Sequence, residues 1–138
     1  MCDLTPDHLV TFSDSVLAPS EARSYVRQHG CPEHGTIAMD ALLLVASELV
    51  TNALRHGRPP IGLRLSCLAS EVRLSVSDTG SGLPREQGTG TCGGLGLVLI
   101  AKIAREWGTS PSRSGKEVWC RVPTGMLPVR RASEARWC

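Results

Sequence analysis

The stretch Glu48-Leu-Val-Thr-Asn52-Ala-Leu-Arg-His56 decides the fold, because it is the second half of a long apolar segment, residues 36–56. At about 100° per residue this segment predicts a helix, capped by Thr36, with Glu48 and Asn52 at the border of its buried stripe. Both could reach one small ligand, since residues four apart stack on one helix face. Taken alone, the segment favours a solvated Glu48 and a surface amide. The expected core stripe is Leu42, Val45, Ala46, Leu49, Val50 and Ala53.

Length and composition indicate one self-sufficient domain. A chain of 138 residues buries about two thirds of its unfolded surface. The formal net charge is only +2, and scattered basic residues argue against a nucleic-acid surface. No apolar run is long enough to span a membrane and no charged leader precedes one, so we expect a soluble, cytoplasmic protein.

The six cysteines indicate free thiols rather than a disulfide scaffold. None forms a C-x-x-C pair, and Cys67 and Cys120 fall in strand-like alternation, where buried free thiols are common.

Two elements are predicted before the central helix. Residues 8–13 indicate a short edge strand, with Pro19 closing the loop that follows it. Residues 20–29 indicate a helix with Ser20 as its N-cap and Gly30 as its stop.

Two strands are predicted after the central helix. Residues 61–68 and 71–78 alternate with a period of two, which favours an antiparallel hairpin. In the second strand Asp78 shares a face with apolar side chains, where a carboxylate needs a partner. The alternative is that Asp78 only starts a turn through its own backbone.

The next stretch is typical of a ligand-binding loop. Residues 80–96 contain seven glycines and one proline and lead into an apolar helix predicted over residues 95–105. Glycine-exposed amides at a helix N-terminus are a phosphate-binding arrangement.

Two closing strands complete the predicted fold. Residues 107–110 and 117–122 flank a turn at residues 111–115, with Val118, Cys120 and Val122 facing inward. The element order favours an α+β, two-layer α/β sandwich in which helices cover one face of a mixed, mostly antiparallel sheet. We expect one domain over residues 8–123 and a loosely ordered tail over 124–138.

Three motifs stand in one order: Glu48-x-x-x-Asn52 on a helix, Asp78-x-Gly80-x-Gly82 after a strand, and Gly94-Leu-Gly96-Leu at a helix start. In this order and spacing they resemble the GHKL ATPase superfamily, and within it most closely the stand-alone anti-sigma-factor serine/threonine kinases. The resemblance covers residues 12–123 and implies the Bergerat, histidine-kinase ATPase-like fold. It reverses the preference for a solvated Glu48.

The resemblance implies a role for each matching residue. Asn52 matches a Mg²⁺ ligand. Glu48 matches the general base of phosphoryl transfer. Asp78 matches the carboxylate that accepts a hydrogen bond from the adenine amino group of ATP, and Gly82 lets backbone approach the base. The remaining nucleotide-binding positions are Arg55, His56, Gly80, Gly93, Gly94, Leu95, Gly96 and Leu97.

Two positions depart from the family pattern. Cys92 stands where relatives often carry glycine in the ATP lid, and Glu117 aligns with a Thr or Ser that helps to bind adenine. An inward carboxylate beside Asp78 would weaken nucleotide binding by like-charge repulsion. Because Val118 and Cys120 define the buried face, we expect Glu117 to point outward.

The resemblance implies an ATP- and Mg²⁺-dependent kinase that binds a sigma factor and phosphorylates an antagonist protein on Ser or Thr, with homodimerisation left open. The alternative is a non-catalytic ATP-binding module whose ordered lid exposes a partner surface. A histidine-kinase fragment is disfavoured, because no helical segment with a phosphoacceptor histidine precedes the domain and His8 lies in a strand-like stretch. A Rossmann domain is also disfavoured, because its glycine loop follows its first strand directly.

Overall fold

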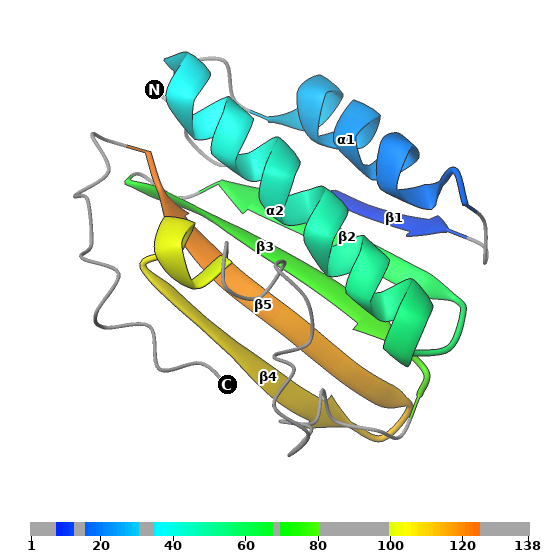
Figure 1. The fold of residues 1–138 in the computed structure, drawn as a ribbon. Helices are drawn as coiled ribbons and strands as arrows, with labels where there is room; N and C mark the ends of the chain where they lie inside the picture. The colour runs from blue at the N-terminus through cyan, green and yellow to red at the C-terminus, as the bar shows by residue number, and fades with distance from the viewer. Residues whose placement is uncertain (1–7, 13–15, 31–34, 68–69, 81–99, 125–138) are drawn as a thin grey trace.

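The computed structural model describes residues 8–12, 16–30, 35–67, 70–80 and 100–124. Two helices lie side by side on one face of a five-stranded sheet (Figure 1). This is the predicted α+β two-layer arrangement. The elements are β1 (His8–Phe12), α1 (Ala18–His29), α2 (Gly35–His56), β2 (Ile61–Cys67), β3 (Glu71–Asp78), β4 (Glu106–Ser112) and β5 (Gly115–Pro123). Residues 100–103 add a short helical segment, the only described part of the helix expected over residues 95–105.

The sheet has the strand order β1-β2-β3-β5-β4. Every neighbouring pair in the described sheet is antiparallel, and β1 is an edge strand, as predicted. Pro111 was expected in the last turn but belongs to β4, where it lies opposite Lys116. Since β4 is the other edge strand, a residue without an N–H is tolerated there.

The start of α1 differs from the prediction. The helix begins at Ala18 with Leu17 as its N-cap, and Pro19 lies in its first turn rather than closing the preceding loop. Proline fits this position because the first helical N–H groups have no partner within the helix. Ser20 is therefore not the cap. The predicted stop is confirmed, because the N–H of Gly30 donates to the carbonyl of Val26 at 2.7 Å.

The predicted apolar stripe of α2 is confirmed. It packs against the inward side chains of the central strands and of α1, and each fully buried Leu or Val contributes about 1.5–3 kcal/mol. The buried stripe of α2 comprises Leu42, Val45, Ala46, Leu49, Val50 and Ala53, and the buried strand residues include Leu63, Leu65, Val72, Leu74, Val76, Cys120 and Val122. In the described part of the chain, no helix has the length and apolar character that crossing a membrane requires.

Cys67 and Cys120 are both free, buried thiols, as expected. Burial raises the pKa of the Cys120 thiol to about 12 from an ordinary value of 9.0, against the smaller opposing effects of the Arg73 charge and a backbone hydrogen bond involving Leu74. The folded chain therefore keeps this proton over a pH range in which the unfolded chain releases it.

Stability should fall above about pH 9 because of Cys120. Its contribution is intact below the unfolded pKa and is lost as the pH rises toward the folded pKa, which amounts to about 1.4 kcal/mol by pH 10. Urea unfolding at about pH 8 and pH 10 tests this. Cys120→Ala should show a shallower decline than the wild type, whereas Cys67→Ala, the matched control, should keep the wild-type decline. Equal slopes for both variants would contradict the assignment.

Candidate functional site

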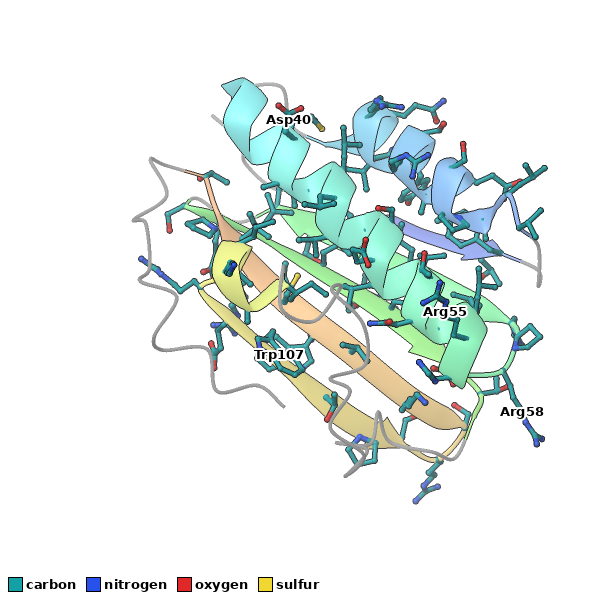
Figure 2. All side chains as sticks on the ribbon, in the orientation of Figure 1. Asp40, Arg55, Arg58 and Trp107 are labelled. Atoms are coloured by element: carbon teal, nitrogen blue, oxygen red, sulfur yellow. The ribbon has the colours of Figure 1, made fainter. Side chains whose placement is uncertain are left out.

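The site is built where α2 ends above the end of β3. The N–H of Gly57 closes the last turn of α2 by donating to the carbonyl of Ala53 at 2.8 Å. Figure 2 shows Arg55 and Arg58 at this end of the helix, with the Arg58 side chain projecting away from the sheet. The Thr79 N–H donates to the Arg58 carbonyl at 2.9 Å. This bond ties the segment after α2 to the end of β3.

Asp78 lies at the centre of this junction and is 5% exposed. Its Oδ1 accepts a hydrogen bond from the N–H of Gly80 at 2.7 Å and another from the N–H of Arg58 at 3.3 Å. The first contact is a local turn of the kind considered from the sequence. The second crosses to another segment, so the Asp78 carboxylate also holds the end of α2 against the sheet.

Lys116 is the partner that the sequence analysis missed. It lies opposite Asp78 in the β3–β5 register and is only 5% exposed. Its Nζ lies 3.8 Å from Asp78 Oδ2 and donates to the carbonyl of His56 at 3.4 Å. A cation at the C-terminal end of a helix is favourable because the last carbonyls carry partial negative charge. Extending the inward alternation of Val118, Cys120 and Val122 back by two residues would have found it.

Three glycines allow this close approach. A Cβ on Gly57 would overlap the Asp78 carboxyl group, and one on Gly80 would lie 2.9 Å from Asp78 Oδ1. Gly115 has a φ of +151°, and its Cβ would overlap the Asp78 backbone carbonyl. Glycine is the residue that accepts both the conformation and the contact. Three separate segments thus converge on one carboxylate.

Glu117 points to the other face of the sheet, as expected. Its Oε1 accepts a hydrogen bond from Arg73 Nη2 at 2.9 Å, and the Arg73 guanidinium lies 5.5 Å from the Trp119 ring centroid. The repulsion considered from the sequence therefore does not arise. The alignment of Glu117 with the adenine-binding hydroxyl needs correction, because the residue of the last hairpin that lies beside Asp78 is Lys116.

The other predicted site residues divide into two groups. Glu48 and Asn52 are half-buried on α2, whereas Arg55 and His56 are exposed at its end. The neighbouring hydroxyl of Thr51 is held by the carbonyl of Ser47 at 2.7 Å. The remaining predicted positions, Gly82, Cys92, Gly93, Gly94, Leu95, Gly96 and Leu97, lie outside the described residues.

The junction offers complementary chemistry for a polar ring edge. Asp78 only accepts hydrogen bonds when ionised, and Lys116 only donates them. Both are shielded from water, where hydrogen bonds are stronger and unpaired groups are costly. Asn52 lies one helical turn before His56, whose carbonyl contacts Lys116. A carboxamide oxygen is a suitable Mg²⁺ ligand, so the residue types present fit a magnesium-bound nucleotide.

Comparison with known families assigns the chain to a class. The family model of the histidine kinase-like ATPase domain matches residues 13–122. The chain therefore belongs to this family, which confirms the resemblance at the level of the GHKL superfamily and implies that the chain binds ATP. A comparison with curated proteins found no match.

Two similar solved structures come from the blue-light activated histidine kinase of Erythrobacter litoralis EL346. Its histidine kinase domain has a TM-score of 0.49 and 26% identity, over 63% of this chain and 45% of that chain. Another structure of that kinase has a TM-score of 0.53 and 21% identity, over 76% of this chain and 40% of that chain. The second likeness shows a shared fold, and the present chain spans less than half of either kinase chain.

Proposed function

We propose that this protein is an ATP- and Mg²⁺-dependent serine/threonine kinase of the anti-sigma-factor type. It acts in the cytoplasm, binds a sigma factor and phosphorylates an antagonist protein. The observation that carries the nucleotide part is the buried Asp78 carboxylate, whose Oδ2 lies 3.8 Å from its nearest described cation. This distance exceeds that of a hydrogen bond. The oxygen therefore retains capacity to accept a hydrogen bond from the amino group of adenine.

The residues of α2 supply the phosphate end of the proposed site. Asn52 would contribute its carboxamide oxygen to Mg²⁺, and the bound metal would neutralise phosphate charge. Glu48, one turn earlier on the helix, would accept the proton of the attacking Ser or Thr hydroxyl. The half-buried positions of both side chains suit this division, because a partly desolvated carboxylate is a better base than a fully hydrated one.

The test is a calorimetric titration of ATP with and without Mg²⁺, followed by a radiolabelled γ-phosphate transfer assay against candidate antagonist proteins. The proposal expects Mg²⁺-dependent binding and transfer to a Ser or Thr of one antagonist. Binding without transfer to any antagonist would favour the non-catalytic module. Absence of ATP binding would overturn the proposal as a whole.

Glu48→Ala should separate these functions. Removing a general base lowers phosphoryl transfer by about 100- to 10,000-fold, while ATP affinity should stay within about threefold, since the carboxylate is not assigned a contact to the bound nucleotide. Single-turnover transfer and calorimetry on the same preparation measure the two effects. Glu21→Ala, on the exposed side of α1, is the control for loss of a carboxylate. Unchanged transfer in Glu48→Ala would refute the assigned role.

A further inference from the structure

We propose that Lys116 is a specificity-determining residue that donates a hydrogen bond to the ring nitrogen N1 of adenine, while Asp78 accepts one from the adjacent amino group. The two side chains would together read one edge of the base. This inference rests on the proposed function, because it concerns the same nucleotide site.

The fold places the two groups for such a role. Asp78 and Lys116 face each other across β3 and β5, and both are 5% exposed. The carbonyl of His56 accepts a hydrogen bond from Lys116 Nζ at 3.4 Å, which holds the ammonium at the end of α2. An ammonium carries three N–H donors, so one lysine can serve a carbonyl, a carboxylate and a ligand atom together.

The separation between the two groups favours a ligand over a closed ion pair. Asp78 Oδ1 accepts backbone N–H groups from Gly80 at 2.7 Å and from Arg58 at 3.3 Å. Asp78 Oδ2, in contrast, stands 3.8 Å from Lys116 Nζ, beyond hydrogen-bond distance. The acceptor and the donor are therefore neighbours that do not close on each other.

The chemistry of the pair matches adenine in particular. The amino group of adenine donates and its neighbour N1 accepts, so an acceptor beside a donor satisfies both atoms. A base with a carbonyl in place of the amino group would set oxygen against Asp78 and a ring N–H against Lys116. A desolvated site discriminates strongly against such a mismatch, because its own polar groups are left unpaired.

The experiment deletes the acceptor from the ligand. The full-length protein is titrated with Mg²⁺-ATP and with its 1-deaza analogue, in which a C–H replaces N1. The wild type should bind ATP about 10- to 100-fold more tightly, as expected for a lost hydrogen bond to a charged donor. Equal affinities would overturn the role of Lys116 while leaving the proposed function intact. Failure to bind either nucleotide would overturn both.

Variants then assign the preference to one side chain. Lys116→Met should bind both nucleotides with nearly equal affinity, and Lys116→Gln, prepared in case the methionine variant fails to fold, should lose most of the preference. Lys102→Met is the matched control, since Lys102 is exposed on the short helical segment at residues 100–103, and it should keep the wild-type ratio. A purely structural Lys116 would weaken both nucleotides equally and preserve their ratio, which would overturn the inference.

Discussion

Asp78→Asn is expected to lower ATP affinity by about 100-fold. The substitution replaces one carboxylate oxygen by an amide N–H₂ group, and hydrogen bonds to charged groups are worth about 1.5–3 kcal/mol. Because Oδ1 is held by the N–H groups of Gly80 and Arg58, the amide oxygen should take that place. The N–H₂ group would then face the adenine amino group, donor against donor.

Stability should also fall, because Asp78→Asn leaves the Lys116 ammonium without its counter-charge in a buried setting. Breaking a buried ion pair from one side costs about 3–5 kcal/mol, and partial relaxation of the lysine would reduce that figure. Calorimetric titration and urea unfolding measure the two effects separately.

A matched control and a second ligand keep the Asp78 prediction specific. Asp40 lies toward the opposite end of α2 (Figure 2) and is exposed, so Asp40→Asn should change neither quantity. The loss in Asp78→Asn should be confined to nucleotides that carry the adenine amino group. A triphosphate of unsubstituted purine lacks that group and should lose much less affinity. An equal loss for both ligands would refute base recognition by Asp78.

Asn52→Ala is expected to abolish the Mg²⁺-dependent part of ATP binding. Mg²⁺ requires near-ideal oxygen ligands, and the loss of a protein ligand leaves the ion held by water and phosphate alone. ATP affinity measured with Mg²⁺ should fall at least tenfold, to the affinity measured in a chelator. Stability should be unchanged or slightly higher, because alanine has a better helix propensity than asparagine and Asn52 lies outside the buried stripe.

Thr51→Ala is the control for Asn52. The Thr51 hydroxyl bonds to the carbonyl of Ser47 at 2.7 Å within the same helix, so its loss should leave the magnesium dependence intact. Titrations of both variants with and without Mg²⁺ decide the matter. A magnesium dependence in Asn52→Ala equal to that of the wild type would show that another group holds the metal.

The sequence by itself determined most of the local structure. The apolar stripe of α2 and the alternation that places Asp78 on the buried face of β3 are periodic patterns, and both are found in the structure. Periodicity predicts such faces because burial of apolar surface is the largest favourable contribution to folding. The motif order was sufficient for the superfamily, as the family match over residues 13–122 confirms.

The tertiary structure decided what surrounds Asp78. Gly57, Lys116 and the Arg58 N–H reach this carboxylate from segments remote in sequence. Their convergence depends on β5 pairing with β3 in one particular register. A shift of that register by one residue would bring Glu117 instead of Lys116 to the inward face. Long-range strand pairing of this kind leaves no local periodic signal, so the charge beside the proposed base site could be read only from the folded chain.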